Sequence, residues 1–425
     1  MNILLLGSGG RECALAWKLR QSPLCKDLYI APGNAGTSEY GVNLNIALSD
    51  FATIKKACIE HRIGTLFPGS EVPLVGGIYD FFKNDDELKD IIVAGPSKAG
   101  AQLEGSKAFS KRFMLRHNIP TAAYREFDEN NFEEGMEYLK HHPLPIVIKA
   151  DGLASGKGVV IAQSTEEAKS VFASMLKEGQ FGEASKKVVV EQFLDGIELS
   201  VFVLTDGEHY VLLPEAKDYK RIHDGDNGPN TGGMGAVSPV PFANAAFMQK
   251  VTDTIIIPTI KGLKNENIIY QGFIFFGLIS VKGEPYVIEY NCRLGDPETE
   301  VVMPRLQNDL VALILKMHEG KLNEATIQYD ERAASTIMLV SEGYPGNYEK
   351  GKIITGFEKV NDSLLFHAGT AKKGNDIVTD GGRVIALTSY GKTLKDALVV
   401  SYENAAMIDY EGKYYRKDIG WEFTG

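Results

Sequence analysis

The sequence predicts a multidomain protein that combines the α/β and α+β classes, with an N-terminal doubly wound parallel-sheet domain and a small C-terminal β-rich domain. One observation is an apolar run at residues 2–6 that stops at a glycine turn and continues into a helical pattern, which is how a βαβ unit begins. A second is the recurrence of short apolar runs that each end in a Gly/Pro loop. The third is a change after Arg332 to strand-like runs between glycine-rich turns.

Length and composition limit the classes of function. A chain of 425 residues with 44% hydrophobic content can bury the cores of roughly two to four domains. Its 45 basic and 56 acidic residues give a net charge of −11, which disfavours a nucleic acid or an anionic membrane as the main partner. The four cysteines show neither C-x-x-C pairs nor zinc-type spacing with histidine, and no apolar run has signal or transmembrane length. We therefore expect a cytoplasmic protein with reduced thiols.

The N-terminal part predicts four parallel strands, at residues 2–6, 28–31, 64–67 and 91–94, with a helix at 11–20. Each strand stops at a loop that contains glycine or proline. Because the carboxyl ends of parallel strands meet at one edge of a sheet, we expect these loops to bind a ligand.

The first of these loops reads G-S-G-G-R-E and resembles a dinucleotide-binding turn. The G-x-G-x-x-G fingerprint fails, because Glu12 stands where the third glycine is required, so NAD or FAD binding is disfavoured. A glycine turn at a helix N-terminus still presents free N–H groups to a phosphate, here with Arg11 beside them. A tight turn selected only for packing stays the alternative.

After Ser106 the pattern predicts a helix at 107–117, a strand at 122–127 and a polar helix that reaches His142. Two more strands follow, and the loop that joins them reads A-D-G-L-A-S-G-K-G.

This glycine-rich loop follows Lys149 and is not a Walker A loop, because Asp151 replaces the first glycine and Gly158 replaces the Ser/Thr metal ligand. We interpret it as a hairpin flap whose backbone N–H groups and lysine cover a triphosphate. A plain surface hairpin is the alternative.

An apolar strand at 188–193 carries Glu191, and the strand after it carries Glu198. Either carboxylate could bind a nucleotide or face solvent. The next segment, 214–241, is rich in glycine, proline and charge, and is predicted to be a long functional loop. Its charged residues are candidates for substrate contact or ordinary surface charges in equal measure.

The stretch Val287–Glu300 begins as a strand. Since strand side chains alternate between faces, Glu289, Asn291 and Arg293 are predicted to share one face, and Ile288, Tyr290 and Cys292 the other. A carboxylate and an amide are hard oxygen ligands that suit Mg²⁺, and a guanidinium suits a carboxylate or phosphate. A half-buried strand with a solvated polar face is the alternative.

The remaining elements are predicted by periodicity. No cluster of reactive residues is expected after Arg332, and the C-terminal part is expected to close the site. The predicted helices are 246–265, 301–319 and 393–408, and the predicted strands are 272–281, 286–290, 335–339, 366–370 and 383–390.

Several motifs, in order along the chain, carry a family resemblance. They read G-S-G-G-R-E, V-I-K-A-D-G-L-A-S-G-K-G-V-V, P-E-A-K-D-Y-K-R, G-P-N-T-G-G-M-G-A, N-C-R-L-G-D-P-E-T and Y-Y-R-K-D-I-G. Together they resemble the phosphoribosylamine–glycine ligase family, which is an ATP-grasp family. Three positions depart from its pattern, because Cys13, Leu294 and Glu300 stand where that family usually has His, Phe and Gln.

The resemblance implies a pre-ATP-grasp N-terminal domain at 1–105, an ATP-grasp domain of two subdomains at 106–327, and a C-terminal domain at 328–425. The flap subdomain is expected at about 122–192.

The resemblance also implies a reaction. ATP is a co-substrate that phosphorylates the carboxylate of glycine, and the amine of 5-phosphoribosylamine attacks the glycyl phosphate to give glycinamide ribonucleotide. The partners are these three small molecules, with no nucleic acid, no membrane and a monomeric enzyme. The expected metal is Mg²⁺ or Mn²⁺.

Each role is assigned to residues of this sequence on the same resemblance. The implied metal ligands are Glu289 and Asn291, and the implied catalytic residues are Arg293, Asp218 and Lys149. The implied ATP-binding residues are Lys107, Lys149, Gly156, Lys157, Gly158, Glu191, Leu194 and Glu198. The implied substrate-binding residues are Gly9, Gly10, Arg11, Gly33, Asn34, Glu71, Asp218, Arg293, Gly295 and Asp296.

Three alternatives stay open: another ATP-grasp carboxylate–amine ligase, a Rossmann-type oxidoreductase, and a nucleotide-binding regulatory protein without catalysis. The failed glycine fingerprint argues against the second. The first is the hardest to separate, because a small pocket discriminates one methylene by only about 1 to 3 kcal/mol.

Overall fold

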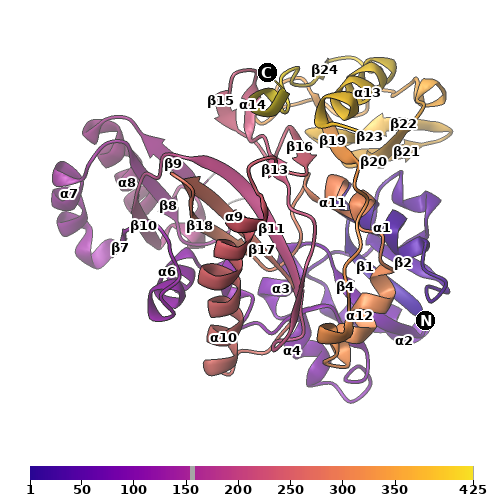
Figure 1. The fold of residues 1–425 in the computed structure, drawn as a ribbon, viewed down its shortest axis with the longest axis horizontal. Coiled ribbons are helices and arrows are strands. Elements are labelled where there is room, and N and C mark those ends of the chain that lie inside the picture. Colours follow the sequence, from indigo (N-terminus) through magenta and orange to yellow (C-terminus); the bar gives the residue numbers. More distant parts are fainter. Residues whose placement is uncertain (154–157, 425) are drawn as a thin grey trace.

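The structure is a computed structural model that describes residues 1–153 and 158–424 (Figure 1). Its N-terminal part is a five-stranded parallel sheet with the order β3-β2-β1-β4-β5. The chain therefore winds outward from β1 in both directions, which confirms the doubly wound prediction. Its strands are β1 (Asn2–Gly7), β2 (Leu28–Pro32), β3 (Val42–Asn43), β4 (Ile63–Pro68) and β5 (Ile92–Val93), and its helices are α1 (Gly10–Arg20), α2 (Phe51–Glu60), α3 (Glu71–Gly76) and α4 (Ile78–Lys83).

Strand β1 shows why this sheet forms. Leu4 and Leu6 pack into one hydrophobic core cluster, whereas Ile3 and Leu5 pack into another, so both faces of the strand are buried. A parallel strand that is covered on both faces reads as a continuous apolar run, as it does here.

A separate sheet, in the range predicted for the flap subdomain and called the flap sheet below, lies at one end of the molecule, on the left of Figure 1. This antiparallel sheet has the order β7-β10-β8-β9, and Phe127, Leu139 and Phe172 belong to a core of its own. Its strands are β7 (Tyr124–Asp128), β8 (Ile146–Ala150), β9 (Val159–Ala162) and β10 (Lys187–Gln192), and its helices are α7 (Phe132–His141) and α8 (Thr165–Glu178).

A second antiparallel sheet forms the middle of the molecule, with the order β12-β11-β17-β18 and β6 paired to β17. The predicted helix at 246–265 is present, with a π-helical turn at Thr252–Ile256 between two α-helical parts. The strands are β6 (Gly95–Pro96), β11 (Ile197–Thr205), β12 (Tyr210–Leu212), β17 (Tyr270–Val281) and β18 (Glu284–Asn291), and the helices are α5 (Gln102–Gly105), α6 (Lys107–Arg116), α9 (Ala245–Val251) and α10 (Ile257–Asn265).

The prediction of one helix at 301–319 is wrong. The structure has α11 (Thr299–Arg305) and α12 (Leu310–His318), with Leu306 in an extended conformation between them. Pro304 weakens the helix near this point, and the Asp309 side chain accepts hydrogen bonds from the first N–H groups of α12. The proline and the N-terminal cap therefore divide the segment into two helices, although its apolar periodicity is continuous.

The C-terminal sheet has the order β13-β16-β19-β23-β20, with β24 paired to β19. Its strands are β13 (Lys217–Asp218), β16 (Gly235–Ser238), β19 (Ala333–Ser341), β20 (Ser363–His367), β23 (Arg383–Gly391) and β24 (Lys413–Tyr414), beside the hairpin β21 (Thr370–Lys373) and β22 (Asp376–Thr379) and the helices α13 (Leu394–Met407) and α14 (Trp421–Thr424). The predicted strand at 366–370 is wrong, because β20 ends at His367 and β21 begins at Thr370.

The segment 214–241 is not the long loop that was predicted. It contains β13 and β16 and the hairpin of β14 (Arg221–His223) and β15 (Asn227–Asn230). Strand β16 pairs with β19, and its Val237 is fully buried. A pairing partner almost a hundred residues away leaves no local sequence signal, which is why the strand was missed.

The domain ranges 1–105, 106–327 and 328–425 stay a prediction, although the C-terminal sheet clearly includes strands from the middle of the chain. None of the helices in the described ranges is long and apolar enough to cross a lipid bilayer.

Candidate active site

One cavity of about 1530 Å³ collects side chains from all three regions of the chain. Of the predicted site residues, those that line it are Arg11, Glu71, Lys107, Lys149, Gly158, Glu191, Leu194, Glu198, Asp218, Glu289, Asn291, Arg293 and Asp296. Gly9, Gly10, Gly33, Asn34 and Gly295 are not among the described residues that line it. Gly156 and Lys157 lie outside the described residues.

Strand β18 presents Glu289 and Asn291 to this cavity, and Arg293, two residues after the strand ends, lines it as well, as the alternation predicted. Cys292 and the 2% exposed Tyr290 belong to the core cluster on the other side, although Tyr290 also borders the cavity, and the prediction for Ile288 is wrong. The register against β17 shifts at this point, so that Ile288 is an extra residue and lines the cavity instead. Such a β-bulge interrupts the alternation of faces.

The guanidinium of Arg293 is held among three acidic or amide side chains. Its Nη2 lies 2.9 Å from Glu104 Oε1 and donates to Asn291 Oδ1 at 3.1 Å, and its Nε lies 3.5 Å from Glu71 Oε2. Burial opposes ionisation of Glu71, but Arg293 and Arg11 outweigh it and lower the pKa of that carboxyl. Arg293 therefore stands in a fixed orientation at the wall of the cavity.

Glu104 was missed by sequence reasoning. It lies on the short helix α5, and its Oε2 accepts hydrogen bonds from the backbone N and the Sγ of Cys292 at 2.8 and 3.0 Å. Burial raises the pKa of Glu104 even though Arg293 opposes the shift. A single glutamate before a helix gives no signal, because its partners lie almost two hundred residues away.

A second cluster joins α6 to the flap sheet. The Nζ atoms of Lys111 and Lys149 each lie 3.0 Å from Glu191 Oε2. Burial lowers the pKa of Lys111 to about 8, while the two lysines outweigh burial at Glu191 and lower the pKa of that carboxyl. Lys107 lies one helical turn before Lys111, and its Nζ donates to the carbonyl of Gly152. The helical spacing from Lys107 was the one signal that could have identified Lys111.

A third cluster faces these lysines from the middle of the molecule. Lys220 Nζ lies 2.7 Å from Glu198 Oε2 and 4.0 Å from Asp218 Oδ1. Burial raises the pKa of Asp218, and burial with the nearby Asp218 charge raises the pKa of Glu298 to about 7. Neither Lys220 nor Glu298 was predicted, although both lie beside predicted residues.

Asp296 is bound from the C-terminal sheet. Arg383 Nη1 lies 2.9 Å from Asp296 Oδ1 and donates to the Asp296 carbonyl at 2.8 Å. Arg383 also lines the cavity, which agrees with the expectation that the C-terminal part closes the site, although Arg383 itself was not predicted. Beside this pair lies Glu300, which is fully buried, and burial with the Asp296 charge raises its pKa. The departure from Gln at this position therefore introduces a buried acid whose surroundings favour the neutral form.

The glycine turn is occupied by protein groups. Gly9 N–H donates to Glu12 Oε2 at 2.7 Å, and Arg11 Nε lies 2.6 Å from Glu12 Oε1. The Asn34 amide donates to the carbonyls of Ser8 and His367 at 2.8 and 2.7 Å. These contacts fit the packing alternative, and a substrate role for Gly9, Gly10, Gly33 and Asn34 stays a prediction.

The donor atoms of Glu289 and Asn291 fit a hard divalent metal. Both side chains carry oxygen atoms at the same cavity, and Asn291 Oδ1, which accepts one hydrogen bond from Arg293 Nη2, keeps a second lone pair for a metal. A metal that also binds phosphate and water needs only one or two protein ligands. Within residues 1–153 and 158–424, there is no cluster of three or more His, Cys, Asp or Glu side chains that could hold a metal alone.

Comparisons with known proteins place this geometry in a family. Models of phosphoribosylglycinamide synthetase match the chain in three parts: the N domain at residues 1–104, the ATP-grasp (A) domain at 105–299 and the C domain at 334–422. The phosphoribosylamine–glycine ligase of Yersinia pestis is 47% identical and that of Haemophilus influenzae 46%, each across 99% of this chain and 98% of the relative.

Comparison with solved structures supports the same family. The crystal structure of phosphoribosylamine–glycine ligase from Thermotoga maritima superposes with a TM-score of 0.85 at 35% identity, over 98% of this chain and 100% of that one. The biotin carboxylase domain of a Hydrogenobacter thermophilus carboxylase, at 18% identity and a TM-score of 0.73 over 97% and 91% of the two chains, shares the fold. The ATP-grasp match implies that ATP is a substrate and that a divalent metal is used. The chain belongs to the phosphoribosylamine–glycine ligase family of ATP-grasp enzymes.

Proposed function

We propose that the large cavity is the active site in which this ligase joins glycine to 5-phosphoribosylamine through a glycyl phosphate, with ATP as the phosphoryl donor. The products are glycinamide ribonucleotide, ADP and phosphate. The observation that carries the proposal is the meeting, in one cavity, of Glu289 and Asn291 with the buried lysines and with Arg293. Oxygen ligands, phosphate-binding cations and a carboxylate-binding fork are the groups that this chemistry requires.

ATP is proposed to lie between the flap sheet and the middle sheet. Lys107 and Lys149 contact the phosphates, and the family resemblance adds Gly158 together with Gly156 and Lys157, the last two of which lie outside the described residues. Glu191, Leu194 and Glu198 surround the adenosine. Mg²⁺ or Mn²⁺, held by Glu289 and Asn291, would neutralise phosphate charge during transfer. The lysines supply fixed positive charge from a buried position, where it acts more strongly than in water.

Glycine is proposed to bind between Arg293 and Asp218. The Nε of Arg293 is buried and donates no hydrogen bond to any described residue, and the carboxylate nearest to it, Glu71 Oε2, lies 3.5 Å away. The ionised form of Asp218 would accept the ammonium group of glycine. Both partners are held in place by neighbouring side chains, which keeps the carboxylate oriented toward the phosphoryl group.

The aminosugar phosphate is proposed to approach from the N-terminal domain. Arg11 contacts the phosphate and Glu71 the ribose. The remaining residues proposed for this part of the site are Gly9, Gly10, Gly33, Asn34, Gly295 and Asp296. The amine then attacks the glycyl phosphate, and exclusion of water protects that intermediate. No covalent enzyme intermediate is needed. We further propose a monomeric cytoplasmic enzyme, to be checked by sedimentation and fractionation.

The test is ADP release by the purified protein with Mg-ATP, glycine, and phosphoribosylamine formed in situ from ribose 5-phosphate and ammonia, with each component omitted in turn. Release that requires all components supports the proposal, and release without glycine contradicts it. Alanine and serine in place of glycine separate this ligase from one that acts on another acid.

A further inference from the structure

The C-terminal motif Y-Y-R-K-D-I-G, residues 414–420, has no role in the proposed reaction, yet it contains a fully buried arginine. The side chain of Arg416 is 0% exposed and lies between β24 and α14. A buried guanidinium is costly unless carboxylates and carbonyls satisfy its donors. The groups that bind the Arg416 guanidinium therefore indicate the role of this residue.

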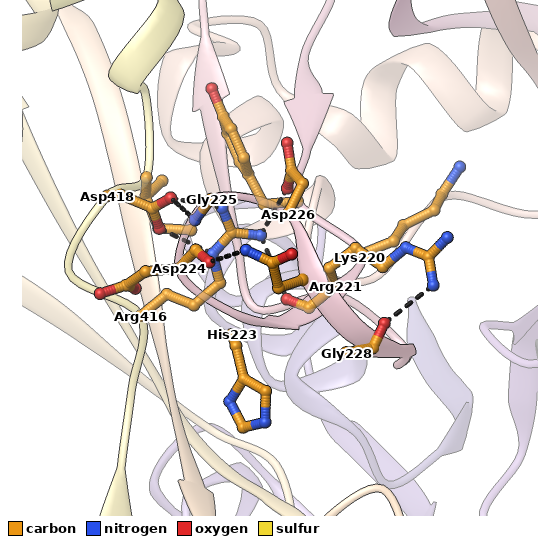
Figure 2. A network of polar contacts seen from close by, with 12 residues as sticks. Lys220, Arg221, His223, Asp224, Gly225, Asp226, Gly228, Arg416 and Asp418 are labelled. Carbon is orange, nitrogen blue, oxygen red and sulfur yellow. Dashed lines mark hydrogen bonds and ion pairs between the residues drawn. The ribbon is translucent and has the colours of Figure 1, made fainter.

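Arg416 connects two segments that are far apart in the chain (Figure 2). Within its own segment, its Nε and Nη2 donate to the two oxygens of Asp418, each at 2.8 Å. Its Nη1 donates to Asp226 Oδ1 at 2.7 Å and to the Arg221 carbonyl at 3.1 Å. The pair with Asp418 fixes the plane of the guanidinium, and the remaining donor holds the hairpin β14–β15.

Two backbone contacts reinforce this connection. Asp418 Oδ2 accepts a hydrogen bond from Gly225 N at 2.7 Å, and Asp224 Oδ1 accepts one from Lys417 N at 2.9 Å. Without the guanidinium, Asp224, Asp226 and Asp418 would be three neighbouring carboxylates with no cation between them. The arrangement therefore depends on Arg416.

The hairpin that Arg416 holds forms part of the cavity wall. Arg221, Asp226 and Asn230 line the cavity, as does Lys220 immediately before the hairpin. The tip of the hairpin is exposed, and its two short strands pair with each other. A two-stranded hairpin is marginal in isolation, so its position depends on contacts with the rest of the molecule.

We propose that Arg416 is a positioning residue, which fixes the hairpin 221–230 so that Arg221 meets a phosphate-bearing substrate in the cavity. That substrate is either ATP or the aminosugar phosphate, and the inference rests on the proposed function. Arg416 itself touches no substrate. Its loss should weaken the binding of one phosphate-bearing substrate, while glycine binding stays as it is.

The experiment compares Arg416→Met with Arg332→Met. Arg332 is a control with the same local contacts but with a side chain that is 54% exposed: it pairs with Asp330 two residues away and lies over the Tyr390 ring, as Arg416 pairs with Asp418 and lies over Tyr219. Arg332 does not line the cavity among the described residues. The KM values for ATP, glycine and phosphoribosylamine are measured separately, after wild-type turnover has been shown to require all three.

We expect Arg416→Met to raise the KM for ATP or for phosphoribosylamine about tenfold or more, with kcat within about twofold and the glycine KM unchanged. Arg332→Met should leave all three KM values unchanged. A folded Arg416→Met protein with unchanged KM values, or with all three raised together, overturns the proposal. If wild type shows no glycine-dependent turnover, the proposed function fails instead.

A second variant keeps the test decisive if Arg416→Met does not fold. Asp226→Asn leaves the pair of Arg416 with Asp418 in place and weakens only the connection to the hairpin. It should raise the same KM as Arg416→Met, and the double variant should be no worse than the more impaired single variant. Unchanged KM values in folded Asp226→Asn, or additive effects in the double variant, contradict a shared positioning role.

Discussion

At the scale of single residues, the site depends on side chains whose neighbours leave some atoms free. Glu289 lines the cavity, and its side chain has neither a hydrogen bond nor an ion pair with any described residue. This is expected of a side chain whose oxygen atoms bind a metal. We therefore predict that Glu289→Gln lowers kcat at least about a hundredfold, because several kcal/mol of charge neutralisation is lost. Steady-state ADP release measures this.

The control for that substitution lies on the same strand. Glu284→Gln removes an exposed carboxylate of β18 that pairs with Lys250, away from the cavity, and should leave kcat unchanged. If both variants unfold at the temperature of the wild type, the loss of kcat in Glu289→Gln comes from the reaction and not from unfolding. Turnover at the wild-type rate in Glu289→Gln would exclude the metal assignment.

The buried pair of Lys111 with Glu191 supports a second residue-scale prediction. Lys111 is 2% exposed, so Lys111→Met leaves a buried carboxylate with one cation fewer. Breaking a buried ion pair typically costs about 3 to 5 kcal/mol, and we expect a loss in the free energy of unfolding of that order. Denaturant titration measures it. Lys55→Met is the control, because Lys55 also pairs with carboxylates, Asp85 and Glu87, but its side chain is 25% exposed, so its loss should have less effect.

These residues also show what sequence can predict at this scale. Glu289, Asn291 and Arg293 were identifiable because alternation along one strand places them together without any knowledge of the rest of the fold. Glu104 and Arg383 were not, because their partners are distant in the chain. The prediction for Ile288 was wrong because of a β-bulge. A bulge depends on how β18 pairs with β17, and the sequence of β18 alone does not reveal that pairing.

At the scale of elements, local periodicity predicted most helices and strands, whereas β16 required long-range pairing. Gly235 in β16 shows how tightly this strand is inserted: a Cβ atom there would lie 2.6 Å from the carbonyl oxygen of Thr336 and 3.0 Å from Ile419. Overpacking of this kind typically costs about 1 to 3 kcal/mol, so Gly235→Ala should lower the free energy of unfolding by about 2 kcal/mol. Chemical denaturation measures the change.

Gly64→Ala provides the matched control for that substitution. Gly64 is also a strand glycine, in β4, but a Cβ atom there would be no closer than 3.5 Å to its nearest neighbour, Met1. Alanine should be tolerated at this position, because alanine in a strand loses less backbone entropy on folding than glycine does. Equal destabilisation by the two substitutions would contradict the close insertion of β16.

At the scale of the whole molecule, the cavity exists because three regions of the chain meet around it. Motifs identified those regions, but the sequence could not show that strands from residues 217–238 complete the C-terminal sheet. Nor could it show that Arg383 reaches Asp296, or that Asn34 binds the backbone of His367. Such contacts depend on the packing of complete domains, and no periodicity records them.

The contact at His367 makes this packing sensitive to acid. His367 is 4% exposed, its ring Nδ1 lies 3.0 Å from Thr370 Oγ1, and its backbone carbonyl accepts a hydrogen bond from Asn34, in the loop after β2 of the N-terminal sheet. Burial, with a smaller contribution from Lys372, lowers the pKa of His367 to about 4. The folded protein therefore binds this proton more weakly than the unfolded chain, whose histidine has a pKa of about 6.5. The resulting stability is present above pH 6.5 and is lost as the pH falls toward 4.

We predict that the free energy of unfolding falls by about 3 kcal/mol between pH 7 and pH 4 because of this one group, since each pKa unit corresponds to about 1.4 kcal/mol. His367→Gln, which can still hydrogen-bond Thr370 but does not titrate, should lose less stability over that interval. Urea titrations at a series of pH values measure both curves. His141→Gln is the control, because its side chain is 79% exposed and its curve should follow wild type. If stability falls with pH equally in His367→Gln and wild type, protonation of His367 is not the cause of the loss. The contact between the N-terminal and C-terminal sheets would then not depend on the protonation state of His367.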